Sequence, residues 1–253
     1  MPEALKTRSS IFPVLLLTFP SPSEIAVGKV KDGVYLGTGF FARFPTFVAF
    51  ITARHVVEIR VEPHQRIGIA SLSDDGKYWW ESFEHHHTAD LAFARFQPDQ
   101  LRSFVRPLPI LPDPPVLERG TPVHTFGFPF TTRSPAPDGK VAMTIEELFF
   151  SGYIATHYDR DLLVSSLQYP FGVNYALSFE VPAGLSGAPL LVVSGGAQHV
   201  CGLVYANRSI HTQVEEYEET DTPGGPIVKT RVVRAHHLGL ASSIAEIASI
   251  PPL

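Results

Sequence analysis

The chain has 253 residues, of which 44% are apolar and 18% charged, so its composition fits a globular protein with a sizeable core and excludes a disordered one. A formal net charge of −5 and the absence of a basic run argue against electrostatic binding to nucleic acid or to an anionic membrane. The one cysteine, Cys201, permits no intramolecular disulfide, which favours a reducing, cytoplasmic location.

The first apolar stretch, residues 11–19, follows Lys6 and Arg8. It is short, contains Pro13 and precedes no A-x-A cleavage site, so we interpret it as a first β-strand and not as a signal peptide. Short apolar and β-branched runs then continue along nearly the whole chain, separated by turn residues. The expected strands cover residues 12–18, 34–44, 47–52, 66–72, 77–83, 91–96, 122–128, 141–155, 162–167, 175–181, 190–193, 200–206 and 227–233. This pattern predicts an all-β protein built from barrels or a sandwich.

Five prolines in residues 107–119 exclude a central strand there, because proline removes ladder donors. We interpret 107–119 as a linker between an N-terminal barrel, residues 11–106, and a C-terminal barrel, residues 120–236. The acidic stretch 215–221 is expected to form an exposed loop. Apolar residues spaced by three and four predict a C-terminal helix over 237–250, with Ser242 or Ser243 as its N-cap.

Three short motifs carry chemically useful side chains. His55 follows an apolar strand, Asp90 opens another, and Ser186 lies in the run Val-Pro-Ala-Gly-Leu-Ser-Gly-Ala-Pro-Leu. Each has an ordinary structural interpretation: a core histidine, a turn or cap residue, and a Gly-Ser turn. Their order along the chain, His then Asp then Ser, predicts a catalytic triad. The flanking glycines allow the amides of Gly184 and Ser186 to form an oxyanion hole.

The runs Gly-Thr-Gly-Phe (37–40), Thr-Ala-Arg-His-Val-Val (52–57), Asp-Leu-Ala (90–92) and Gly-Leu-Ser-Gly-Ala-Pro-Leu (184–190) resemble the trypsin-like serine protease family, and are most similar to its disulfide-free bacterial members. The resemblance covers residues 11 to 240. It implies one peptidase domain over 1–253, made of two six-stranded antiparallel β-barrels of the chymotrypsin type, with His55, Asp90 and Ser186 as its triad and no cofactor.

The resemblance also implies candidate substrate contacts. Glu180 corresponds to the floor of the primary pocket, where a carboxylate would favour Arg or Lys before the cut; an acidic residue paired within the second barrel is the other interpretation. Tyr205, Ala206 and Asn207 resemble the strand that pairs with substrate backbone. Leu185 stands where secreted members have Asp, so we expect it to pack into the second barrel and expect no activation by N-terminal cleavage.

The neighbouring histidines at 85–87 and 236–237 predict no metal site, because adjacent residues of an extended chain point to opposite faces. We therefore expect a serine endopeptidase that acts on protein or peptide substrates, with a regulatory partner chain still open. A catalytically silent binding module on the same fold remains the alternative. An esterase is disfavoured because its G-x-S-x-G serine precedes its histidine. A structural β-sandwich would require all three motifs to be coincidental.

Overall fold

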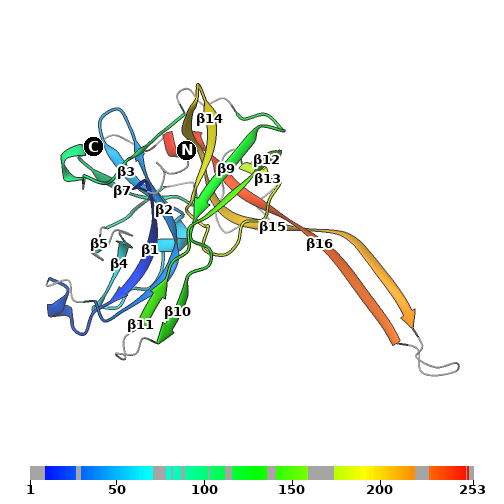
Figure 1. Ribbon diagram of the computed structural model, residues 1–253, viewed down its shortest axis with the longest axis horizontal. Coiled ribbons are helices and arrows are strands. Elements are labelled where there is room, and N and C mark those ends of the chain that lie inside the picture. Colours follow the sequence, from blue (N-terminus) through cyan, green and yellow to red (C-terminus); the bar gives the residue numbers. More distant parts are fainter. Residues whose placement is uncertain are drawn as a thin grey trace.

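A computed structural model describes most of the chain and shows two β-sheets with very little helix (Figure 1). The described residues are 9–26, 30–70, 78–80, 82–86, 89–101, 103–111, 116–135, 141–158, 174–219, 228–248 and 250. The strand expected at 162–167 lies outside them. In the described part of the chain, no helix is long and apolar enough to cross a membrane.

The N-terminal half is an eight-stranded sheet in the order β5-β4-β1-β2-β3-β7-β6, with β8 parallel to β2. The expected first strand is present as β1. The strand bounds are β1 (Ile11–Thr18), β2 (Asp32–Arg43), β3 (Val48–Thr52), β4 (Gln65–Ala70), β5 (Tyr78–Trp80), β6 (Glu84–His85), β7 (Ala92–Phe96) and β8 (Leu108–Pro109). Short 3-10 helices occupy Pro22–Glu24 and Pro98–Gln100.

The C-terminal half is a closed barrel in the order β12-β13-β16-β15-β14-β9, beside a separate β10–β11 hairpin. The strand bounds are β9 (Pro122–Gly127), β10 (Thr132–Pro135), β11 (Val141–Thr144), β12 (Leu148–Tyr158), β13 (Asn174–Leu177), β14 (Pro189–Ser194), β15 (Ala197–Glu219) and β16 (Val228–Ser243). Because the barrel is closed, each of its strands is paired with a neighbour on both sides.

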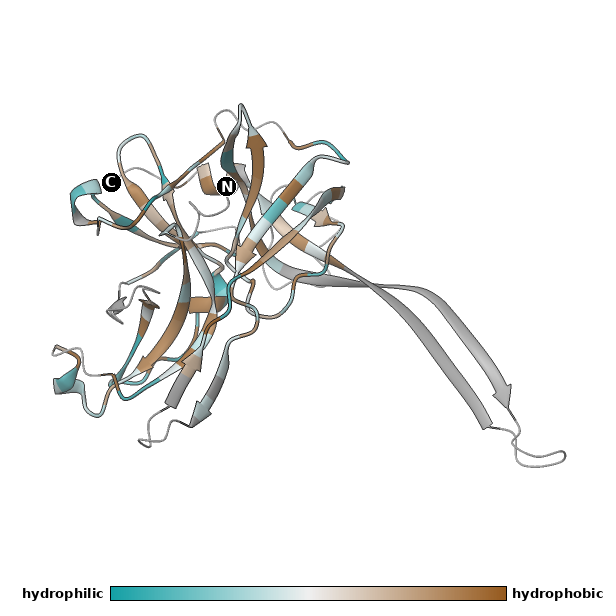
Figure 2. Cartoon of the chain, in the orientation of Figure 1, coloured by the Kyte–Doolittle hydropathy of each residue, from teal (hydrophilic) through white to brown (hydrophobic). Residues whose placement is uncertain are grey.

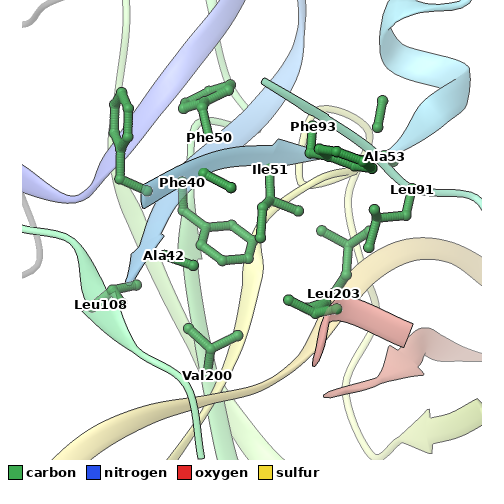
Figure 3. Close-up of a cluster of buried hydrophobic side chains, with 14 of the residues drawn as sticks. Phe40, Ala42, Phe50, Ile51, Ala53, Leu91, Phe93, Leu108, Val200 and Leu203 are labelled. Carbon is green, nitrogen blue, oxygen red and sulfur yellow. The ribbon is translucent and has the colours of Figure 1, made fainter. Parts of the chain in front are cut away.

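One buried cluster crosses from the first sheet to the barrel. Figure 3 shows Phe40 and Ile51 of the first sheet near Val200 and Leu203 of β15, and all four are fully buried. Figure 2 shows the apolar residues concentrated along the strands of both halves. The shared core fixes the two halves against each other, which is the requirement for a site whose residues come from both.

The segment expected to be a plain linker makes defined contacts over residues 108–111. Leu108–Pro109 forms β8 along β2, and Ile110 forms a bridge with Val200. The amide of Leu111 donates to the Val200 carbonyl at 3.0 Å. The linker therefore joins the two halves by strand pairing as well as by sequence.

Two sequence expectations near the C-terminus are wrong. The acidic stretch 215–221 is not a loop over its first five residues, because β15 continues to Glu219. Residues 215–219 lie opposite residues 232–228 of β16 in the backbone register. The helix expected from residue 237 begins only at Ile244, because β16 runs to Ser243.

The terminal helix itself is present as α3 (Ile244–Ala248). Ser243 is the N-cap of the two candidates, since its hydroxyl accepts a hydrogen bond from the Ala245 amide at 3.2 Å. Ile247 is fully buried in the core that the two halves share, so this side chain packs the helix onto the body.

β15 and β16 leave the barrel together as a long two-stranded arm (Figure 1). Their pairing continues from Gly202↔Ser243 in the barrel to Glu219↔Val228, with register shifts at Val204/Ala206 and His211/Gln213. The barrel pairing of β15 with β14 ends at Leu203. The arm therefore begins where β15 has lost its second neighbour.

Candidate active site

His55 lies in α1 (Arg54–Val57), a single helical turn that follows the fully buried strand β3. Val56 and Val57 are buried, and this fixes the turn on the first sheet. The His55 side chain is 40% exposed, so its ring faces outward from the core. Arg54 pairs with Glu58 at 2.7 Å on the surface, which accounts for a charged residue beside the histidine.

Asp90 precedes β7 and is 3% exposed. Its Oδ2 lies 2.5 Å from His55 Nδ1, and its Oδ1 accepts the His55 backbone amide at 2.9 Å. The Asp90 carbonyl also accepts the Arg54 amide at 3.2 Å. A buried carboxylate is costly unless it is paired, and here both oxygens bind one residue. The ring orientation and the Nδ1–H tautomer are thereby favoured.

His86 is a supporting residue that sequence reasoning missed. It is 6% exposed, its amide donates to the Leu91 carbonyl at 2.9 Å, and its Nδ1 accepts the Ala89 amide at 3.1 Å. These bonds fix the backbone on both sides of Asp90. In the structure His85 is exposed and His86 is buried, as expected for neighbouring residues of an extended chain. The sequence alone does not say which of the two faces the core.

Ser186 lies in a turn between two glycines with positive φ, Gly184 at 95° and Gly187 at 90°. A methyl group on Gly187 would lie 2.0 Å from the Thr38 carbonyl oxygen, so only glycine fits. A methyl group on Gly37 would lie 2.8 Å from a Val56 methyl and 2.9 Å from the Ser186 carbonyl oxygen. The serine turn and the histidine turn therefore approach the same point of β2.

The Ser186 hydroxyl donates to the Tyr205 carbonyl at 3.2 Å. Within the residues that the structure describes, no hydrogen bond joins this hydroxyl to His55. The structure thus brings the His55–Asp90 pair and the Ser186 turn to one interface, with the serine hydroxyl turned to β15.

The amides of Gly184 and Ser186 are expected to form an oxyanion hole. Neither has a hydrogen-bond acceptor among the described residues. Around them, the Leu185 amide donates to the Pro182 carbonyl at 3.1 Å, the Gly187 amide to Val204 at 2.8 Å and the Ala188 amide to Leu185 at 2.9 Å. The amides of Gly184 and Ser186 alternate with these bonded ones. Leu185 itself is fully buried in the second barrel, as expected.

Tyr35 and Thr38 on β2 are further residues that the sequence did not identify. The Tyr35 hydroxyl donates to the Gly184 carbonyl at 2.6 Å and the Thr38 hydroxyl donates to the same oxygen at 2.8 Å. Burial raises the pKa of Tyr35, although its hydrogen bond with Thr38 acts in the opposite direction, so the phenol keeps its proton. The glycines of the run 37–39 indicate that another segment approaches β2 closely, but the sequence does not identify that segment as the serine turn.

The candidate substrate contacts lie beside the serine turn. Tyr205 is buried, and its hydroxyl donates to Asn174 Oδ1 at 3.2 Å; burial raises its pKa, as does the nearby Asp90. Ala206 and Asn207 continue β15 opposite Leu240 and Gly239.

Glu180 is exposed in the loop after β13. The neighbouring Phe179 carbonyl accepts the Gly239 amide at 2.8 Å, so this loop lies on β16. An exposed carboxylate on a loop that packs on β16 does not form the enclosed acidic floor that the sequence suggested.

Cys201 is fully buried, and burial raises the pKa of its thiol. It lies 3.2 Å from the Leu190 carbonyl inside the second barrel. A protonated, enclosed thiol is a poor nucleophile. Among the described residues, no group of three or more His, Cys, Asp or Glu side chains could bind a metal ion.

Two solved structures of Rv3671c from M. tuberculosis are similar to this chain along its whole length. The inactive form, a serine-to-alanine mutant, aligns with a TM-score of 0.51 and 16% identity, covering 100% of this chain and 93% of that chain. The active form, described as a protease, aligns with a TM-score of 0.50 and 17% identity, covering 100% and 86%. No protein-family model and no curated protein sequence matches the chain. The likeness confirms the expected chymotrypsin-like, two-barrel fold class.

Proposed function

We propose that the chain is a serine endopeptidase in which Ser186 is the nucleophile, His55 the general base and Asp90 the residue that orients the histidine. The observation that carries this proposal is the pairing of both Asp90 oxygens with His55, next to a serine turn from the other half of the molecule. A structural role alone would not need an exposed histidine ring fixed by a buried carboxylate.

The proposed reaction follows from these positions. His55 Nε2 removes the Ser186 hydroxyl proton while Oγ forms a bond to the substrate carbonyl carbon, and the amides of Gly184 and Ser186 donate to the resulting oxyanion. His55 then protonates the leaving amine, the C–N bond breaks and an acyl-enzyme remains. Water, deprotonated by His55, hydrolyses the ester and restores Ser186. Asp90 stabilises the imidazolium in both halves of the cycle.

The position of the Ser186 hydroxyl adds one step. Since it donates to the Tyr205 carbonyl, Oγ must turn from β15 to His55 before attack. A rotation about χ1 between staggered rotamers accomplishes this without backbone movement. A substrate amide that donates to the Tyr205 carbonyl would compete with the Ser186 hydroxyl for this acceptor. Substrate binding at β15 would therefore favour the reactive rotamer.

The hydroxyl position also favours one alternative, a catalytically silent binding module. If Oγ stays on Tyr205, the cleft binds an extended peptide and does not cleave it. Both functions use the same surface, so they differ in one measurable property, the reactivity of Ser186.

Substrate contacts are proposed at Glu180, Tyr205, Ala206 and Asn207. Because Glu180 is exposed, its attraction for a basic side chain is screened by water and contributes about 1 kcal/mol or less. We therefore propose a weak preference for Arg or Lys, up to about fivefold. The cytoplasmic location stays a prediction that rests on the single cysteine.

A fluorophosphonate probe with mapping of the labelled residue tests the function. We expect one label per chain, on Ser186, that is lost in Ser186→Ala. Ser194→Ala removes an exposed hydroxyl at the end of β14 and serves as the matched control, with unchanged labelling. No label on a folded chain that binds extended peptides would establish the silent module. A label on another serine would overturn both candidates.

A further inference from the structure

The peptide unit between Gly184 and Leu185 is bonded at both ends. Its carbonyl oxygen accepts the hydroxyls of Tyr35 at 2.6 Å and Thr38 at 2.8 Å, and its N–H donates to the Pro182 carbonyl at 3.1 Å. A peptide unit is planar, so bonds at its two ends fix its orientation. This unit lies between the two amides that the proposed reaction uses as oxyanion donors.

The following units are bonded as well. The Leu185 carbonyl accepts the Ala188 amide at 2.9 Å, the Ser186 carbonyl accepts the Thr38 amide at 2.9 Å, and the Gly187 amide donates to Val204 at 2.8 Å. Thr38 therefore binds the turn twice, through its hydroxyl and through its amide. The direction of the Ser186 N–H follows from the fixed units on each side of it.

Tyr35 and Thr38 both lie close against the second half. Tyr35 Cε1 would lie 2.8 Å from a methyl group on Gly184, Thr38 Oγ1 lies 2.8 Å from the position of a methyl group on Gly127, and Thr38 is fully buried. The Thr38 hydroxyl also accepts the Phe128 amide at 3.3 Å, which leaves its single proton for Gly184. The two hydroxyls lie 3.1 Å apart, and the shorter contacts of both are to the Gly184 carbonyl.

We propose that Tyr35 and Thr38 are positioning residues for the oxyanion site: from β2 of the first half they fix the serine turn of the second half, so that its amides point at the substrate carbonyl oxygen. This inference rests on the proposed function. Donors whose direction is set before the reaction stabilise the developing charge without reorganisation, which is the source of their catalytic effect.

Because two hydroxyls share one acceptor, they replace each other in part. In Tyr35→Phe or Thr38→Val the Gly184 carbonyl keeps one donor, so the turn stays in place and kcat falls less than about tenfold. In the double variant the carbonyl has neither donor, and the turn can rotate away from the position that the reaction needs. We then expect kcat to fall by about 10²–10³, the loss observed when an oxyanion donor is removed, with KM within about twofold.

The matched control is Tyr175→Phe. Tyr175 is a buried tyrosine of the second barrel whose hydroxyl accepts the Leu117 amide at 3.3 Å, so its loss lowers the free energy of unfolding without touching the turn. We expect normal kcat in this variant. In the Tyr35→Phe background, Thr38→Ser keeps one hydroxyl on the Gly184 carbonyl and should retain most of the activity, whereas Thr38→Val leaves the carbonyl without a donor. Rescue by Ser but not by the isosteric Val in this background separates hydrogen bonding from packing.

A second readout is independent of turnover. Amide hydrogen exchange in the Ser186→Ala background should show faster exchange at Leu185 and Gly187 in the Tyr35→Phe/Thr38→Val variant than with both hydroxyls present. The amides of β13, which pairs with β12 and β16, should stay unchanged. If exchange is faster in the double variant but Ser186 of the wild-type chain never reacts with the fluorophosphonate probe, the positioning role is supported and the proposed function is overturned. Wild-type kcat in the folded double variant, or exchange at Leu185 and Gly187 that does not change, would overturn the positioning role itself.

Discussion

Asp90 binds His55 through both carboxylate oxygens, one to the ring nitrogen Nδ1 at 2.5 Å and one to the backbone amide at 2.9 Å. The side chain and the main chain of the histidine are therefore oriented by the same buried group. This double contact makes the pair specific, because a substitution at residue 90 changes both the tautomer and the position of the helical turn that carries the ring.

Asp90→Asn should lower kcat by about 10⁴-fold, because an amide in place of the carboxylate favours the wrong histidine tautomer. The same substitution has this effect in a related triad. The free energy of unfolding should change by about 1–3 kcal/mol. The measurement is single-turnover peptide cleavage alongside thermal unfolding. Asp99→Asn, at an exposed position of the nearby 3-10 helix, is the control and should behave as wild type. A full-rate Asp90→Asn enzyme would contradict the orienting role proposed for Asp90.

Gly187→Ala should abolish activity and destabilise the fold by about 3 kcal/mol or more, since the new methyl group meets the Thr38 carbonyl at 2.0 Å and φ is positive. Gly195→Ala is the matched control: its φ is also positive, at 59°, but no atom lies within 4 Å of the added methyl group. It should cost about 1 kcal/mol and leave the rate unchanged. Denaturant unfolding of both variants measures the difference. Equal losses would show that the contact with Thr38 does not limit the turn.

Because residue 185 is leucine, we expect the activity not to require cleavage near the N-terminus of the chain. It is fully buried where a salt bridge to an ammonium group would need an aspartate, so the chain with an intact, sequenced N-terminus should be active in a peptide-library assay. Leu185→Asp should instead unfold easily, because burying a lone carboxylate costs several kcal/mol. Activity that arises only after trimming near residues 10 to 35 would contradict this view.

His124 should make the second barrel sensitive to acid. Burial lowers the pKa of this histidine, so below the ordinary histidine pKa the unfolded chain binds more protons than the folded one. The free energy of unfolding should therefore fall as the pH decreases through about 6.5 toward the folded-state pKa. His124→Gln should flatten this dependence in urea unfolding at a series of pH values. His85→Gln, at an exposed position, should leave it in place. An identical slope in all three proteins would exclude His124 as the cause.

The sequence predicts most strands because the apolar runs and turn residues are local signals. It also predicts the pairing of His55 with Asp90, whereas the contact of Ser186 with His55 stays a prediction. The Ser186 rotamer could not be predicted, because it depends on a carbonyl of β15. The donors Tyr35 and Thr38 were equally hidden, since their acceptor lies about 150 residues away in the chain.

The errors have a common physical origin. Residues 215–219 were expected in a loop because acidic runs are usually solvated, yet a strand pairs through its backbone, and residues 228–232 of β16 lie opposite this run. The late start of α3 has the same cause, since residues 237–243 pair along β15 and β13. Helical spacing of apolar residues does not reveal a competing strand partner.

The arm formed by β15 and β16 has a consequence for what stability means in this protein. Beyond Asn207 and Gly239, the described pairing joins these two strands only to each other, and a two-stranded ribbon is marginally stable by itself. Its amides should exchange with solvent at free energies that rise from nearly zero at Glu219↔Val228 toward the global value at Gly202↔Ser243. A melting temperature or a denaturant midpoint would report the two packed halves alone, while the arm opens and closes many times before they unfold.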